Sequence, residues 1–274
     1  MNLTIEKIEK ITHQPEEFAA LANLVYVKDH QLTIRRHKHG RGFYYTDKEK
    51  RKITDKTSLE RIKKLVIPPA WKEVRITHLK NGHLQVVGRD TKNRKVYRYH
   101  DLWSKFKNQT KFFKMASFGE KLPQIRKQVD KDLELEGMPK QKVLALVVRL
   151  MEETHIRIGN HYYAKNNQTY GLSTLRSRHV NVSHDILTFD FIGKKGKEHH
   201  IEVTDQDLIE LINECEEIPG WELFKYYDEN GDKDHIDSGM INEYIQTICG
   251  EYYSAKDFRT WAATKIYFEA LRDL

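Results

Sequence analysis

The sequence contains little cysteine and no long apolar run. Cys215 and Cys249 are its only cysteines, and they lack both CxxC spacing and clustered histidine partners. Neither a disulfide scaffold nor a zinc site is supported, so we expect two buried thiols and no metal. No segment approaches the roughly 18–20 apolar residues of a membrane span, and the N-terminal MNLTIEKIEK is too charged for a signal peptide. We therefore expect a cytoplasmic protein that has no membrane contact.

Positive charge is present in excess, and it is unevenly distributed. The net charge is +7, yet residues 1–110 hold 25 Lys or Arg against 12 Asp or Glu, whereas residues 111–274 hold 22 against 28. A basic part of this size attracts polyanions, which makes nucleic acid the first candidate partner. Charge alone would also fit ribosomes, RNA or acidic proteins.

Short apolar runs separated by turn signals predict strands in the first 100 residues. The pair Asn81-Gly82, between two such runs, predicts a two-residue hairpin turn. One short helix, SLERIKKLV, ends before two prolines. The predicted strands are LVYV (24–27), QLTIRR (31–36), GFYYT (42–46), KEVRIT (72–77) and HLQVVGRD (83–90).

Helical periodicity begins near residue 101. Pro123 and Pro139 stand near two predicted helix starts, and the second of these helices is expected to run through residue 165. Three strands within 178–203 should form a small sheet, followed by helices at 205–216, 238–250 and 254–273. The last helix begins with a capping box, Ser254 and Asp257. We thus predict an α+β protein with a sheet-rich domain (1–103) and a mainly helical domain (104–274).

Three cationic stretches of the second domain suit the binding of one phosphodiester. Arg157 lies near the predicted end of a long apolar helix, Lys194 lies between two predicted strands, and Arg259 lies in the first turns of the last helix. Arginine offers planar paired donors to phosphate oxygens, and lysine can add a proton donor. Each residue taken singly is more typical of a surface charge or an ion-pair partner.

These stretches resemble the type IB DNA topoisomerases of the bacterial and poxvirus kind. The resemblance covers nearly the whole chain, and five blocks in family order are far more specific than any one of them. The blocks are IPPAWKEVRI (67–76), GHLQVVGRDTKNRKVYRYH (82–100), IRIGNHYYAKNNQTYGLSTLRSRHV (156–180), FIGKKGKEHHIEV (191–203) and AKDFRTW (255–261).

The resemblance implies a fold and a chemistry. The helical domain would share the catalytic fold of tyrosine recombinases and type IB topoisomerases. A tyrosine would attack a DNA phosphodiester, form a 3′-phosphotyrosyl link, allow the free strand to swivel and then permit religation. The link conserves the phosphodiester energy, so neither ATP nor a metal nor another cofactor is required. The expected partner is double-stranded DNA, bound by a monomer located at the nucleoid, with the two domains closing around the duplex.

Position by position, the resemblance makes Arg157 and Arg259 the pair that binds the scissile phosphate. Lys194 would be the general acid on the departing 5′ oxygen, delivered by a flexible β-hairpin tip. Lys195 and Lys197 would hold that tip near phosphates, although Lys195 replaces a residue that is acidic in some relatives. Hairpin register leaves open which of the three lysines is the acid.

The first domain carries the other expected DNA contacts. Gln and Arg can read base edges and further cations can position the backbone, while the alternative is a solvated basic hairpin. The expected DNA-binding residues are Arg35, Arg36, Arg41, Gln85, Arg89, Arg94, Lys95, Tyr97, Arg98 and, in the second domain, Tyr163.

Two members of the family's active site have no counterpart in the sequence. The family histidine and nucleophilic tyrosine follow the KDFR-type motif at a distance, whereas only 15 residues follow Arg259 here. Tyr267 is the one tyrosine after Arg259, and a single helix would separate the two by roughly 12 Å. We expect a type IB body whose nucleophile lies outside this chain. The alternatives are a non-catalytic DNA-binding relative and, less well matched, a tyrosine recombinase.

Overall fold

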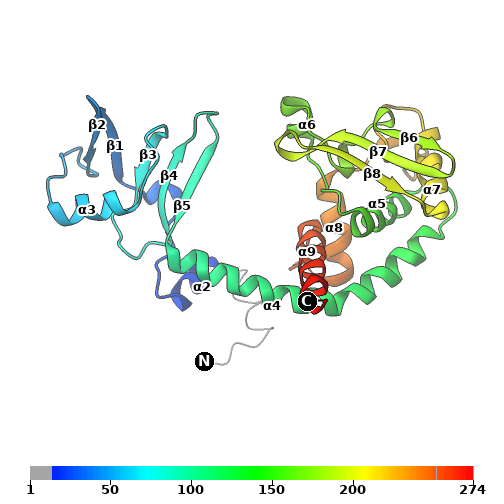
Figure 1. Ribbon diagram of the computed structural model, residues 1–274, viewed down its shortest axis with the longest axis horizontal. Helices are drawn as coiled ribbons and strands as arrows, with labels where there is room; N and C mark the ends of the chain where they lie inside the picture. Colours follow the sequence, from blue (N-terminus) through cyan, green and yellow to red (C-terminus); the bar gives the residue numbers. More distant parts are fainter. Residues whose placement is uncertain (1–13, 251, 274) are drawn as a thin grey trace. The chain divides into compact units, whose positions relative to one another are not determined.

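The computed structural model describes residues 14–250 and 252–273 (Figure 1), so the segment MNLTIEKIEK lies outside the described residues. The chain divides into two compact units, Met1–Lys114 and Met115–Leu274. Within the described residues, no helix combines the length and apolar character that crossing a membrane requires.

The first unit is built on a five-stranded antiparallel sheet, which confirms the predicted sheet-rich N-terminal part. Inward-facing residues of three strands, including Ile34, Ile76 and Val86, pack against Ile62 of the helix SLERIKKLV. The sheet order is β2-β1-β3-β4-β5. The elements of this unit are α2 (Pro15–Leu21), η1 (Asp29–Gln31), β1 (Ile34–His39), β2 (Gly42–Thr46), α3 (Lys56–Lys64), β3 (Lys72–Ile76), β4 (Leu84–Arg89), β5 (Lys95–Tyr99) and the start of α4 (Asp101–Leu133).

The second unit surrounds helix α5, in which residues 143–148 are all buried. One continuous core joins this helix to other helices and to Leu187 and Phe189 of the small sheet. The sheet has three strands, as predicted, in the order β6-β7-β8. Cys215 and Cys249 are both buried, as expected. The elements are α5 (Lys140–Thr154), α6 (His161–Asn167), η2 (Leu172–Thr174), η3 (Ser177–His179), β6 (Val180–Ser183), β7 (Ile186–Ile192), η4 (Lys194–Gly196), β8 (Glu198–Val203), α7 (Gln206–Glu217), β9 (Lys225–Tyr227), β10 (Lys233–His235), α8 (Ser238–Cys249) and α9 (Ala255–Arg272).

Two helix boundaries differ from the prediction. Pro123 lies inside the 33-residue helix α4 instead of starting a new helix. A proline there removes one backbone hydrogen bond, but Phe118, Leu122 and Ile125 are buried on both sides of it and hold the helix together. Conversely, the predicted helix 139–165 is two helices, because α5 ends at Thr154 and the next residue, His155, has a left-handed backbone conformation with φ 56°.

The Asn81-Gly82 pair does not form a two-residue hairpin turn, so that prediction is wrong. Strands β3 and β4 are joined by residues 77–83, and the side-chain amide of Gln85 donates to the carbonyls of Leu79, Lys80 and Gly82. A buried carboxamide thus sets the geometry of this loop, which local turn propensity cannot reveal. The run LVYV forms only an isolated bridge, between Val25 and Gly82.

Candidate nucleic-acid interface and phosphate site

Arg157 is presented by a loop, not by a helix as predicted. It is exposed and lies next to buried Ile156. Its carbonyl accepts a hydrogen bond from the Leu172 amide at 2.8 Å, and the neighbouring Ile158 carbonyl accepts one from Ser173 at 2.7 Å. A Cβ at Gly171 would lie 2.3 Å from the Arg157 carbonyl oxygen, so only glycine permits this approach. The arginine therefore projects from a backbone that is fixed by a second segment.

The lysine-rich tip joins β7 to β8 as predicted. The Gly193 amide donates to the Lys197 carbonyl at 2.7 Å, and Lys195 has φ 68°, which closes a short helical turn. Lys194, Lys195 and Lys197 are exposed, and within the described residues none has a carboxylate within ion-pair distance. Strand β7 is held directly before the tip, where the Tyr170 amide donates to the Ile192 carbonyl at 2.8 Å.

Arg259 lies in the second turn of α9. The capping box is confirmed, because the Ser254 amide donates to the Asp257 carboxylate at 2.9 Å. Phe258 is buried in the core, and the next residue, Arg259, is half-buried. Burial and, second, the charge of Arg157 lower the pKa of Arg259. The two arginines are thus close enough for their charges to interact.

His199, on β8, connects the three cationic elements. Its ring stacks on Phe191 at 4.8 Å and covers Gly193, where a Cβ would lie 2.6 Å from the ring. Burial and then the charges of Lys197, Arg157 and Arg259 lower the pKa of His199. The His199 ring thus packs on the lysine hairpin and lies within range of the charges of Arg157 and Arg259. Sequence reasoning overlooked this histidine, although the return strand EHHIEV placed it directly after the lysine tip.

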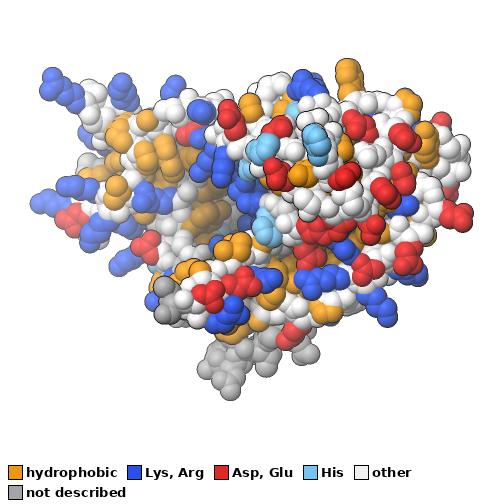
Figure 2. All heavy atoms as spheres, turned by 45° about the vertical axis from the view of Figure 1, so that its right-hand side comes forward, with side chains coloured by type: hydrophobic (Ala, Val, Ile, Leu, Met, Phe, Trp, Pro, Cys, Tyr) orange, Lys and Arg blue, Asp and Glu red, His pale blue; other side chains and the backbone are white. Residues whose placement is uncertain are grey.

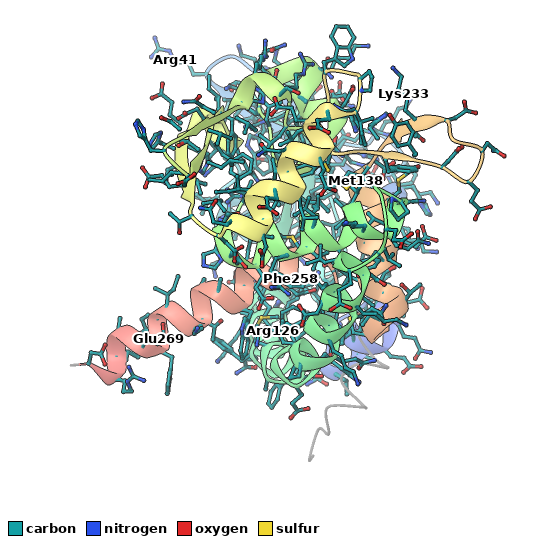
Figure 3. All side chains as sticks on the ribbon, turned by 90° about the vertical axis from the view of Figure 1, so that its right-hand side faces the viewer. Arg41, Arg126, Met138, Lys233, Phe258 and Glu269 are labelled. Carbon is teal, nitrogen blue, oxygen red and sulfur yellow. The ribbon has the colours of Figure 1, made fainter. Side chains whose placement is uncertain are left out.

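Tyr267, which was not expected to be the nucleophile, is remote from Arg259. Tyr267 lies on the same uninterrupted helix as Arg259, eight residues further on, which is roughly 12 Å along the axis. Its side chain is 67 % exposed. Figure 3 shows the end of α9 around Glu269 extending away from the rest of its unit. Tyr253, before the motif, is buried and hydrogen-bonded to Ser117.

Two of the expected DNA contacts in the first unit are corrected by the structure. Gln85 is only 4 % exposed and its amide is bonded to loop carbonyls, so it cannot read base edges. The Arg36 guanidinium donates to the carbonyls of Pro68 and Trp71 and lies 4.1 Å from the Phe43 ring centroid. Burial lowers the pKa of Arg36. Both side chains support the fold.

The remaining residues of the predicted DNA surface are accessible in varying degrees. Tyr97 and Tyr99 lie on one face of β5, 45 % and 40 % exposed, with ring centroids 6.1 Å apart. Arg35, Arg41 and Tyr163 are exposed. The others have protein partners: Arg89 pairs with Glu73, Arg94 with Asp90 and Lys95 with Asp29, and Arg98 donates to the Val66 carbonyl.

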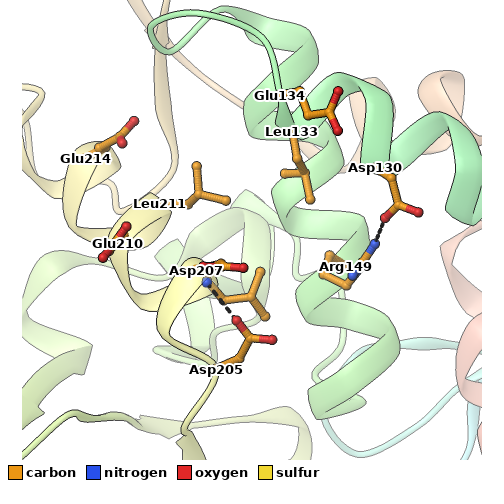
Figure 4. Close-up of a pocket in the computed structure, with 10 residues that line it drawn as sticks. Asp130, Leu133, Glu134, Arg149, Asp205, Asp207, Glu210, Leu211 and Glu214 are labelled. Atoms are coloured by element: carbon orange, nitrogen blue, oxygen red, sulfur yellow. Dashed lines mark hydrogen bonds and ion pairs between the residues drawn. The ribbon is translucent and has the colours of Figure 1, made fainter.

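A separate groove of about 390 Å³ lies between α4, α5 and α7 and has the opposite charge (Figure 4). Carboxylates dominate its rim, including Glu134, Asp207 and Glu210. Asp205 caps α7 by accepting from the Leu208 amide at 3.1 Å, and Arg149 is paired with Asp130. Such a rim repels phosphate. In the described part of the chain, no group of three or more His, Cys, Asp or Glu could hold a metal ion.

Comparison with known proteins gives two family matches. Residues 101–274 match the family described as eukaryotic DNA topoisomerase I, catalytic core. Residues 42–90 match the family described as bacterial DNA topoisomerase IB, N-terminal domain. Together the two matches cover most of both units.

Individual proteins agree with these matches. The chain is 32 % identical over 233 residues to DNA topoisomerase 1B of Acanthamoeba polyphaga mimivirus, covering 84 % of this chain and 69 % of the viral protein. It is 26 % identical over 117 residues to DNA topoisomerase 1B of vaccinia virus (strain Copenhagen), covering 43 % of this chain and 37 % of that protein. DNA topoisomerase 1 of Mycosarcoma maydis is 24 % identical over 196 residues, 64 % of this chain and 19 % of the fungal protein.

Proposed function

Because the chain belongs to the type IB DNA topoisomerase family, we propose that it is the body of such an enzyme, which binds duplex DNA and activates one phosphodiester. Arg157 and Arg259 bind the non-bridging oxygens of the scissile phosphate. Lys194 donates a proton to the departing 5′ oxygen. The observation that carries the proposal is that Gly193, directly before the lysine tip, packs under the His199 ring, on which the charges of Arg157 and Arg259 both act.

The chemistry requires only charge stabilisation, a proton and a nucleophile. A tyrosine hydroxyl gives up its proton to water and its oxygen forms a bond to phosphorus. The bond from phosphorus to the 5′ oxygen breaks, and a proton passes from Lys194 to that oxygen. Religation reverses each step. Two guanidinium groups held in place before the reaction stabilise the added charge of the pentacoordinate transition state without reorganisation. A site of this kind supports relaxation of supercoils without ATP or a metal.

We propose further that the polypeptide of residues 1–274 binds DNA without cleaving it. Among its described tyrosines, Tyr253 is buried and Tyr267 lies along α9 at roughly 12 Å from Arg259, so neither is placed for attack at a phosphate held by the arginines. The nucleophile would then come from residues other than 1–274, which would carry the family histidine and tyrosine. The alternative is a DNA-binding protein that has lost cleavage. In that case, adding the family histidine and tyrosine would not restore relaxation of supercoils.

A plasmid relaxation assay in EDTA, run beside a denaturing gel for covalent adducts, tests the proposal. The 274-residue polypeptide should bind DNA and form no adduct. A fusion to a family segment that contains the histidine and tyrosine should relax the plasmid, and the same fusion with Arg259→Ala should not. An adduct that maps to Tyr267 or another internal tyrosine would contradict the proposal that residues 1–274 bind DNA without cleaving it. A folded fusion that binds DNA but stays inactive would favour the non-catalytic reading.

A further inference from the structure

The arginines of the second unit fall into two groups. Arg126, Arg149 and Arg272 are ion-paired with Glu152, Asp130 and Asp273, respectively. In residues 14–250 and 252–273, no carboxylate lies within 4.0 Å of the other four arginines, which are Arg157, Arg176, Arg178 and Arg259. Two of these four belong to the proposed phosphate site. Arg176 and Arg178, called here the arginine pair, have no role in it.

The arginine pair is organised around one buried tyrosine. Tyr170 is 7 % exposed, and the guanidinium carbons of Arg176 and Arg178 lie 5.6 and 5.9 Å from its ring centroid. The Tyr170 hydroxyl accepts from Arg178 at 3.1 Å and donates to the Gln168 side chain at 2.9 Å. Arg178 is exposed and Arg176 is half-buried. The ring thus holds two like charges near each other at the surface.

No carboxylate of the described residues lies within ion-pair distance of the arginine pair. Burial first, then the charges of Arg178 and Arg176, lower the pKa of His179 to about 4, so this imidazole is neutral at pH 7. Its Nδ1 accepts from the Arg176 amide at 3.1 Å, and its Nε2 lies 3.4 Å from the Arg178 Nε. The contact with Nε2 and the bond to Tyr170 involve two of the five N–H groups of the Arg178 guanidinium. Guanidinium donors of Arg178 therefore remain available for an anion.

The arginine pair lies beside the proposed phosphate site, within the same unit. The Tyr170 amide donates to the carbonyl of Ile192, the last residue of β7 before the lysine tip. The Leu172 amide donates to the Arg157 carbonyl. Two residues of chain separate these bonds, which is at most about 7 Å even when fully extended. One DNA strand could therefore place one phosphate at the arginine pair and another at Arg157.

We propose that Arg176 and Arg178 bind a second DNA phosphate, one that flanks the phosphate held by Arg157 and Arg259. The inference rests on the proposed function, since it names a further contact with the same substrate. The ligand is a phosphodiester oxygen of the duplex backbone, recognised without regard to base sequence. The pair acts by positioning the strand, and it takes no part in bond breaking.

The salt dependence of binding tests this contact. Arg178→Gln and Arg126→Gln each remove one positive charge from the second unit, but Arg126 is paired with Glu152 (Arg126 is labelled in Figure 3). In fluorescence anisotropy with a labelled duplex, Arg178→Gln should reduce the slope of log K against log [salt] by about 1, equally for unrelated sequences, and Arg126→Gln should leave it unchanged. Arg178→Lys should restore most of the slope, whereas a purely structural hydrogen bond to Tyr170 would not be restored by charge.

A neutral methylphosphonate placed at single positions of the duplex identifies the phosphate. A methylphosphonate next to the scissile phosphate should weaken DNA binding by the unchanged protein. The same substitution should not weaken DNA binding by Arg178→Gln any further. Equal slopes for Arg178→Gln and Arg126→Gln, in a protein that still loses slope with Arg157→Gln, would overturn the second contact and leave the proposed function standing. Failure of the unchanged protein to bind duplex DNA would overturn both.

Discussion

At the scale of single residues, two buried histidines make stability depend on pH. His83 is 4 % exposed and its Nδ1 accepts from the Val27 amide at 2.9 Å, while His179 is 8 % exposed. Burial is the main cause that lowers the pKa of each to about 4. An unfolded histidine binds its proton near pH 6.5, so the unfolded state binds more protons between pH 6.5 and 4. The free energy of unfolding should therefore fall as the pH is lowered through this window.

Thermal unfolding at pH 7 and pH 5 measures the effect. After allowance for solvent screening, each histidine should remove on the order of 1 kcal/mol of stability at the lower pH. His83→Gln should be less stable than the unchanged protein at pH 7, because packing against Tyr26 is lost, but its stability should change less between the two pH values. Histidine NMR titrations with both pKa values near 6.5 would contradict the prediction.

At the scale of elements, the β7–β8 hairpin should separate catalysis from binding. Lys194 lies at an exposed tip with no described carboxylate partner, so its amino group is free to approach a leaving oxygen. In a cleavage-competent fusion, Lys194→Ala should slow strand cleavage by about 10²–10⁴, the usual contribution of a general acid. Affinity for DNA should change far less, as for the loss of one phosphate contact.

Single-turnover cleavage of a duplex with a 5′-sulfur leaving group provides the control for the hairpin. Sulfur needs little protonation to depart, so this substrate should restore the rate of Lys194→Ala. Lys195→Ala and Lys197→Ala remove the same charge from the same tip and should behave as binding variants. If sulfur rescued one of these two variants instead, the acid would be that lysine.

At the scale of the whole molecule, charge is divided between the units. Figure 2 shows lysine and arginine side chains over the first unit and many carboxylates on the visible face of the second. Binding should weaken steeply with salt, because each neutralised phosphate releases counterions. Arg41→Gln, at the β1–β2 turn, should lower affinity and slope more than Lys233→Gln, which removes an equal charge from β10 of the second unit (both residues are labelled in Figure 3). Affinity that is constant between low and physiological salt would argue against electrostatic DNA binding.

The sequence by itself determined the elements whose signals are local. Short apolar runs between turn signals predicted β2 and β3, helical periodicity predicted α7 and α8, and the Ser254 capping box predicted the start of α9. The five motif blocks also predicted the family and the lysine hairpin between β7 and β8. Periodicity and capping depend on residues within one or two turns of each other, so they can be read from the chain directly.

Only the tertiary structure decided where several side chains lie. Gln85 and Arg36 have the residue types of DNA contacts, yet carbonyls of distant loops use their donors. Arg157 leaves the helix because the segment at Leu172 bonds its backbone, and His199 meets the arginines because α9 and the hairpin pack in one core. Such partners are remote in the chain, and residue type does not distinguish a donor used inside the fold from one left for DNA. Long-range hydrogen bonds and core packing make that distinction, and they exist only once the chain is folded.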